Sequence, residues 1–167
     1  MRLLVLAALL SVGCSWKNRV KKLSDTEIDH YYALRVFMNE GQHKAYLKTK
    51  EEEDRSAMLK SMGLWDKFYK LEPARRQAIS DGKVEVGWTA EEVRMSWGTP
   101  FDTRNMPGRK AERSKMCVFR FEEQQDGSVL VWEEGSKTEY HAARFFQREV
   151  ILDNDIVAEI RDKNEKW

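Results

Sequence analysis

Apolar residues recur at helical spacing in the first half of the chain and at every second position in the second half. The spacing predicts a first helix from Ser24, which forms a capping-box pattern with Glu27 and precedes apolar positions at Ile28, Tyr31, Tyr32 and Val36. We expect this helix to end at residues 39–41.

A second helix is expected from Thr49, whose role as N-cap is supported by the acids that follow it, to a stop at Gly63. The stretch "LWDKFYKL" is helical or rich in turns. Pro73 suits the first turn of a further helix that ends at Gly82. Residues 24–82 are therefore expected to form one helical region without internal repeats.

The segment "VEVGWTAEEVRMSWGTP" predicts a short helix with defined ends. Each of its special residues has a structural explanation: a tight approach or positive φ at Gly87, a capping box from Thr89 to Glu92, a buried face with Val93 and Trp97, a left-handed C-cap at Gly98 and a stop at Pro100. The two glycine patterns that bind phosphate groups, the P-loop G-x-x-x-x-G-K-[ST] and the dinucleotide-binding G-x-G-x-x-G, are both absent from the sequence. The glycines are thus expected to shape the chain and not to bind a ligand.

From "MCVFRFEE" onward the period is two, which predicts antiparallel strands. "QDG" predicts a hairpin turn before "SVLVWEE", "YHAARFFQREVIL" predicts a longer strand, and "DND" at 153–155 predicts a tight turn in which Asn154 takes positive φ. The last strand would place Ile156, Ala158 and Ile160 on one face. The fold class is α+β, with N-terminal helices and then a short helix packed on a small antiparallel sheet. Its expected core is Val93, Trp97, Phe119, Phe121, Ile156 and Ile160.

The N-terminus resembles a bacterial lipoprotein signal. Arg2 precedes an apolar run over residues 3–12, which is about half of the ~20 residues that a spanning helix needs. Small residues then lead to Cys14, as in the lipobox, where the cysteine thiol takes a diacylglycerol and the chain is cut before it. The alternative is an ordinary cleaved signal with an unrelated cysteine. We expect a signal peptide over 1–13 and membrane attachment through acyl chains on Cys14.

Residues 14–23 are expected to be a lipidated tether with four cations, which are either simply solvated or attracted to anionic headgroups. With Cys14 acylated, Cys117 is the single remaining thiol, so no internal disulfide is expected. Cys117 lies in an alternating apolar run and is interpreted as a core residue.

Composition narrows the function further. The chain has 167 residues, which suits one domain. Although 34% of the residues are charged, the net charge is only +1, so the chain has no strong positive potential that would attract nucleic acid. Its histidines, His30, His43 and His141, match no zinc motif, and no nucleophile motif is present. We therefore expect a binding or scaffold protein, not an enzyme, with no metal and no cofactor.

One segment is a candidate contact surface. The loop "DTRNMPGRKAERSK" at 102–115 surrounds Pro107 and Gly108 with Arg104, Arg109, Lys110, Arg113 and Lys115. It is either a contact surface or a mobile solvated loop.

The motif from Gly87 to Pro100 resembles the G-M-T-x-x-x-V-x-x-x-L-G-x-P pattern of the BamE (SmpA/OmlA) family of outer-membrane lipoproteins, with Trp88 and Trp97 in the places of Met and Leu. The closing "REVILDNDIVAEI" is similar to the family's last hairpin, and the lipobox agrees. The resemblance covers residues 83–162 and the signal. It implies a lipid anchor in the outer membrane facing the periplasm, and contacts with lipid and partner proteins near the loop 102–115.

Two functions follow. The first is a scaffold or accessory subunit in outer-membrane assembly or maintenance that acts through an envelope protein partner. The second is a lipid-tethered periplasmic binding or inhibitor module, or a component of another surface machine. Ser15, next to the cysteine, favours the outer membrane, because lipoprotein sorting in many Gram-negative bacteria retains Asp at that place.

Overall fold

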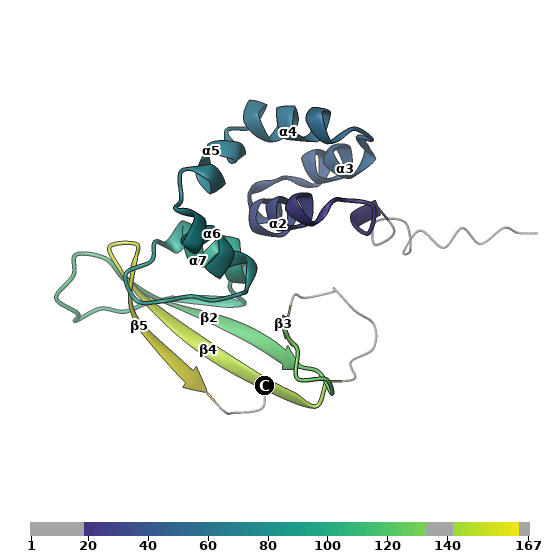
Figure 1. Ribbon diagram of the computed structural model, residues 1–167. Helices are drawn as coiled ribbons and strands as arrows, with labels where there is room; N and C mark the ends of the chain where they lie inside the picture. Colours follow the sequence, from purple (N-terminus) through teal and green to yellow (C-terminus); the bar gives the residue numbers. More distant parts are fainter. Residues whose placement is uncertain (1–18, 133–141, 164–167) are drawn as a thin grey trace, which may run out of the picture.

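The computed structural model describes residues 19–132 and 142–163. Within these residues the protein is α+β, as the sequence predicts: six α-helices come first and a five-stranded antiparallel sheet follows (Figure 1). No helix of this part of the chain is long and apolar enough to cross a bilayer.

The helices precede the sheet without interruption. They are α2 (Asp25–Leu34), α3 (Glu40–Lys48), α4 (Glu52–Ser61), α5 (Leu64–Tyr69), α6 (Pro73–Ser80) and α7 (Ala90–Trp97), with a 3-10 turn η2 (Arg35–Phe37) after α2. The Ser24 hydroxyl accepts a hydrogen bond from the Glu27 N–H, and the Glu27 carboxylate accepts one from the Ser24 N–H, so the predicted capping box of α2 is confirmed. Gly63 separates α4 from α5 at φ 67°, and Pro73 occupies the first turn of α6.

The helix boundaries between residues 39 and 52 were predicted wrongly. Residues 39–41 do not end a helix: Asn39 is the N-cap of α3 and forms a second capping box with Gln42. Thr49 is the C-cap of α3, and α4 begins only after Glu51. Gly41 suggested a stop, but the reciprocal Asn39–Gln42 bonds satisfy two helix-end donors, so the helix starts despite the glycine.

The folded part begins before residue 24. Val20 and Leu23 are buried in the main core, and the Leu23 N–H bonds to the Val20 carbonyl. The second half of the expected tether 14–23 is therefore part of the domain. Apolar burial accounts for this, because each of these side chains gains about 1.5–3 kcal/mol on leaving water.

The sheet consists of β1 (Asp102–Asn105), β2 (Ser114–Glu123), β3 (Val129–Val131), β4 (Arg144–Asp153) and β5 (Ile156–Lys163), in the order β1-β2-β4-β5, with β3 also paired to β2. All pairs are antiparallel. The segment expected to be a loop from residue 102 therefore starts with a strand, whose four polar residues gave no alternating signal. The β4–β5 turn is as predicted, with positive φ at Asn154, and Asp155 also has positive φ.

The last strand differs from its expected pattern. Leu152 pairs with Val157 but Ile151 pairs with Glu159, so Ala158 is an extra residue in β5. This β-bulge reverses the alternation. Ile156 is therefore 42% exposed and is not in the core, whereas Val157 is buried and Ile160 packs against the core.

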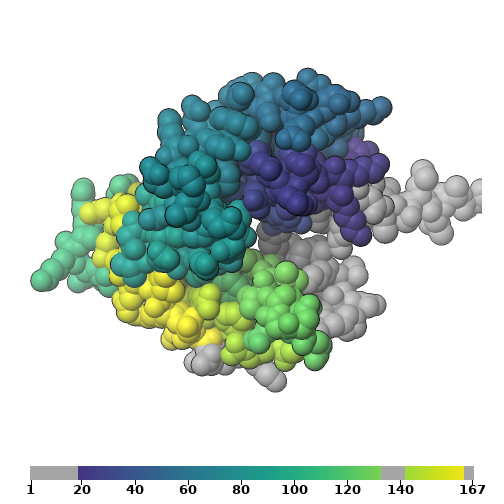
Figure 2. Space-filling view, in the orientation of Figure 1, coloured from purple at the N-terminus to yellow at the C-terminus, as the bar shows by residue number. Residues whose placement is uncertain are grey.

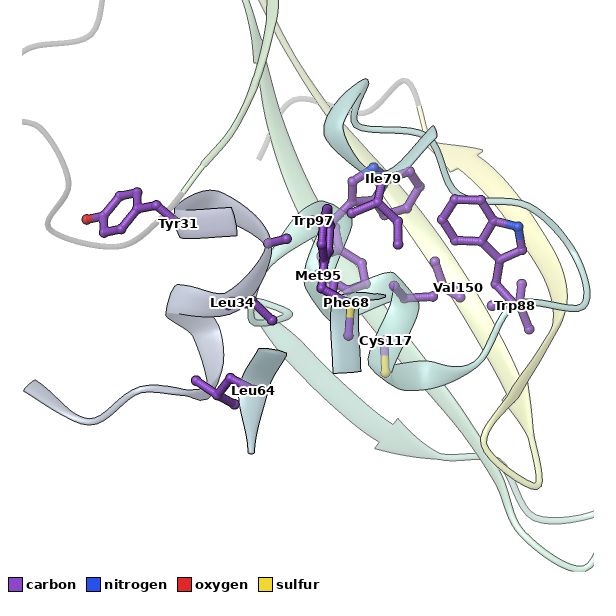
Figure 3. Packing of buried hydrophobic residues seen from close by; sticks show 14 of the residues in the cluster. Tyr31, Leu34, Leu64, Phe68, Ile79, Trp88, Met95, Trp97, Cys117 and Val150 are labelled. Atoms are coloured by element: carbon purple, nitrogen blue, oxygen red, sulfur yellow. The ribbon is translucent and has the colours of Figure 1, made fainter. Parts of the chain in front are cut away.

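One core joins the helices to the sheet. Figure 3 shows Leu34, Phe68 and Ile79 from the helical region in the same cluster as Trp97, Cys117 and Val150. Val93, Trp97, Phe119 and Phe121 are each 2% exposed, so this part of the predicted core is confirmed. A domain of this size thus uses one continuous hydrophobic core.

Candidate functional site

The predicted lipid-attachment residue, Cys14, lies outside the described residues. The other predicted residues, those of the glycine-bracketed motif and of the arginine-rich segment, are described and can be placed.

The motif joins α7 to the start of β5. Gly87, at φ 89°, donates its N–H to the Val157 carbonyl at 2.8 Å, and the Val157 N–H donates to the Trp88 carbonyl at 2.7 Å. Thr89 bridges to Ile156 and caps α7 in the predicted box with Glu92. Residues 87–89 are therefore bonded to the start of β5 by these backbone hydrogen bonds and one isolated bridge, which fixes the N-terminus of α7 on the sheet.

The other end of α7 is held by Trp97. Its indole N–H donates to the Gly82 carbonyl at 2.7 Å, and its ring meets Phe119 and Phe121 edge-on, with centroids 5.3 and 5.1 Å away. Gly98 has positive φ, as expected, but its ψ of −148° takes it out of the left-handed helical region that the sequence predicted. That combination is open almost only to glycine. The motif residues thus all serve the fold.

The arginine-rich segment forms a hairpin that is tied to the β4–β5 turn. Arg109 holds Asp153 with two hydrogen bonds, at 2.9 and 2.7 Å, and the Ser114 hydroxyl donates to the same carboxylate. These bonds lower the pKa of Asp153 to about 2, with the Arg109 bond the larger cause. Asp153 therefore stays ionised, and the Arg109 charge is compensated.

The five predicted cations do not form one patch. Arg104 pairs with Asp102 at 2.6 Å, and Arg113 pairs with Asp155 at 3.4 Å. Lys115 lies opposite Leu152, which is buried in the core, so Lys115 belongs to the helix-covered face of the sheet. Lys110 is exposed at the hairpin. We call residues 106–113, between β1 and β2, the arginine hairpin.

Two stretches far apart in the sequence, residues 35–43 and residues 98–99, form a groove that the sequence did not predict. A cavity of about 270 Å³ lies between η2, the start of α3 and the residues after α7, and is lined by Arg35, Val36, Met38, Glu40, His43, Gly98 and Thr99. It offers both signs of charge and a hydroxyl. The Asn39–Gln42 capping box was the available sequence signal for the helix that forms one wall.

Polar groups also fasten the helical region internally. The buried Arg55 guanidinium holds the Glu27 carboxylate with two hydrogen bonds, at 2.5 and 2.9 Å, and donates to the carbonyls of Thr49 and Lys50. Burial acts to raise the pKa of Glu27, but the hydrogen bonds from Arg55 and Ser24 outweigh it and lower the pKa. The pair ties α2 to the α3–α4 junction.

Two histidines pair with tyrosines across α2. His30 bonds to the Tyr69 hydroxyl of α5, and the Tyr31 hydroxyl lies 2.5 Å from His43 Nε2 of α3. His30 is enclosed by the rings of Trp65, Phe68 and Tyr69, and its burial lowers its pKa. The imidazole of His30, enclosed by aromatic rings, joins α2 to α5 and does not line the groove at His43 and Thr99.

Nothing in the described ranges, 19–132 and 142–163, groups three or more His, Cys, Asp or Glu side chains where they could hold a metal ion. Burial raises the pKa of Cys117, which is the opposite of what a reactive thiol needs. Comparisons with protein-family models, with curated proteins and with solved structures find no match for this chain.

Proposed function

We propose that this protein is a lipid-anchored, non-enzymatic scaffold of the bacterial envelope, with a BamE-like arrangement of α7 on its sheet. The outer membrane, facing the periplasm, is its proposed location, and Cys14 is the proposed lipid attachment site. The observation that carries the proposal is the separation of two ends of the molecule. One end receives the chain from the anchor, and the other bears the arginine hairpin.

The anchored end is defined by Val20 and Leu23, which are packed into the core. Val20 is six residue steps after Cys14, and an extended chain covers at most ~3.6 Å per step, or about 20 Å in total. An acylated Cys14 would therefore keep the start of α2 close to the bilayer. Figures 1 and 2 show residues 19–23, in purple, at one side of the molecule.

The arginine hairpin lies at the opposite side, together with the β4–β5 turn (Figures 1 and 2). A projection can only shorten a separation, so the two ends are truly apart. In a chain held at Cys14, the hairpin would face away from that bilayer. Since Arg109 and Arg113 are also neutralised by Asp153 and Asp155, the arrangement favours a protein partner at this end over anionic phospholipid.

Co-purification tests the proposal. The full chain, tagged at its C-terminus and solubilised from the envelope, is expected to retain a protein partner, and the variant Arg109→Glu/Arg113→Glu is expected to lose it. The barrel-assembly insertase among the retained proteins would favour the assembly scaffold. A different retained partner would favour the alternative, a lipid-tethered binding or inhibitor module. Retention that is equal for wild type and variant would contradict a partner site at the hairpin.

A further inference from the structure

The outer edge of β5 is covered over only part of its length. Residues 87–89 pair with Ile156 and Val157, and beyond Val157 none of the described residues pairs with this edge. Figure 1 shows β5 as the outermost strand of the sheet. An uncovered strand edge presents N–H and C=O groups that can pair with another chain.

The β5 register shows which of these groups point outward. The N–H and C=O of Val157 bond to Trp88 and Gly87, so they point away from β4. Val157 lies opposite Leu152, and Ile160 lies opposite Val150, two residues earlier on β4. Because hydrogen-bonding direction alternates along an antiparallel strand, the backbone groups of Ile160 point outward as well.

The charges around Ile160 are self-complementary for an antiparallel partner of the same sequence. If Ile160 lies opposite its own copy, Glu159 lies opposite Arg161 of the copy, and Arg161 opposite Glu159. Shifting the register by two residues in one direction places Glu159 opposite Glu159. A shift in the other direction places Arg161 opposite Arg161. Opposite charges across a strand pair stabilise it and like charges destabilise it, so one register is favoured.

We propose that β5 pairs with β5 of a second copy of this chain, with a two-fold axis at Ile160. The two sheets then continue into one another, and the interface is isologous, as in most homodimers. Ile160, which is only partly buried in one copy, is covered by Ile160 of the other. Within one copy Glu159 and Arg161 bond to each other, at 2.7 and 2.9 Å, and both side chains are more than 40% exposed, so they are available to pair across the axis. The inference does not depend on the lipid anchor or on the arginine hairpin.

Reversing the charge of Glu159 or of Arg161 distinguishes contacts between two copies from the Glu159–Arg161 contact within one copy. Two forms of the full chain with different C-terminal tags are made in the same cells and solubilised in detergent, and one tag is used to capture the other. Wild-type forms are expected to co-purify. Glu159→Arg places two arginines opposite each other twice, and Arg161→Glu does the same with glutamates, so each variant should capture its own kind about tenfold less.

The decisive sample mixes the two variants. A Glu159→Arg chain opposite an Arg161→Glu chain restores both opposite-charge contacts across the axis, although neither chain regains its internal Glu159–Arg161 pair. Co-purification should therefore return in the mixture, and also in the double variant Glu159→Arg/Arg161→Glu. Circular dichroism melting of each variant confirms folding. Lys44→Glu, which breaks the exposed ion pair with Glu40 on α3 and leaves the β5 edge unchanged, should capture as well as wild type.

Two results would overturn the proposal. One is absence of co-purification between wild-type forms that are folded. The other is failure of the mixed variants to capture each other while wild-type forms do, which would show that the copies associate through another surface.

Discussion

The helical region and the α7–sheet region share one apolar core, but the contacts that supplement it differ between them. In the helical region, buried polar pairs connect α2 to α4, through Glu27 and Arg55, and α2 to α5, through His30 and Tyr69. Between α7 and the sheet, the contacts are apolar and aromatic, centred on Trp97. Apolar contacts are indifferent to pH and tolerate little loss of volume, whereas buried polar pairs depend on both partners being present and correctly charged.

The largest expected effect is in the aromatic region. Trp97→Ala removes a fully buried ring and its hydrogen bond to Gly82, so we expect the free energy of unfolding to fall by about 3–5 kcal/mol in urea titrations. Trp65→Ala, which removes a partly exposed tryptophan from the helical region, is the matched control and should cost clearly less. Equal losses would contradict the difference between the two regions.

The second effect tests the buried ion pair. Arg55→Met leaves the Glu27 carboxylate buried without its partner and should cost about 3 kcal/mol. Adding Glu27→Gln removes the stranded charge but keeps an amide for the capping box with Ser24, so the double variant should regain much of the loss. If the two substitutions instead destabilise additively in chemical denaturation, the pair is not coupled.

These two regions also differ in how far the sequence could predict them. The 3.6-residue period, two capping boxes, the strand alternation and the "DND" turn identify the start of α2, α7, β2 and the β4–β5 turn correctly, but not the helix boundaries between residues 39 and 52. They could not identify β1, whose residues are all polar, or the bulge at Ala158, because neither depends on local preference. Pairing with β2 makes β1 a strand, and the fit of β5 to β4 and to residues 87–89 sets the bulge.

The sites follow the same division. Residues that are close in the sequence, such as Thr89 and Glu92, were assigned correctly because their interaction is local. The Arg109–Asp153 pair connects residues 44 apart, and the groove at His43 and Thr99 is made by two stretches that are distant in the sequence. Charge counting on one segment therefore predicted a basic surface where the folded chain has compensated arginines.

The third effect concerns the end of α7. Asn tolerates the left-handed region, so Gly63→Asn, where nothing lies within 4 Å of an added Cβ, should change stability by less than about 1 kcal/mol. Gly98 has a ψ of −148°, which asparagine does not adopt readily, and Gly98→Asn should cost about 1–3 kcal/mol. Thermal melting of both variants would check this, and a harmless Gly98→Asn would mean that its backbone is ordinary.

The smallest effect is a pH dependence confined to the helical region. The pKa of His30 is lowered by burial, so the unfolded chain binds a proton more readily, and stability should fall as the pH drops below about 6.5, the ordinary value for His. Asp153 behaves differently: its pKa of about 2 means that its contribution is complete above about 3.8 and is lost only below that. Urea midpoints at pH 7 and pH 5 should therefore differ for wild type and differ less for His30→Gln. If the difference between the two midpoints is as large in His30→Gln as in wild type, the pH dependence belongs to another group.

The central proposal is that a lipid on Cys14 holds the protein on the envelope and leaves the arginine hairpin facing away from the bilayer. Mass spectrometry of the mature N-terminus tests it most directly. The account predicts a chain that begins at residue 14 and carries the mass of a diacylglycerol and an N-linked acyl chain on that cysteine. A chain that still begins at Met1, or one with an unmodified Cys14, would contradict it.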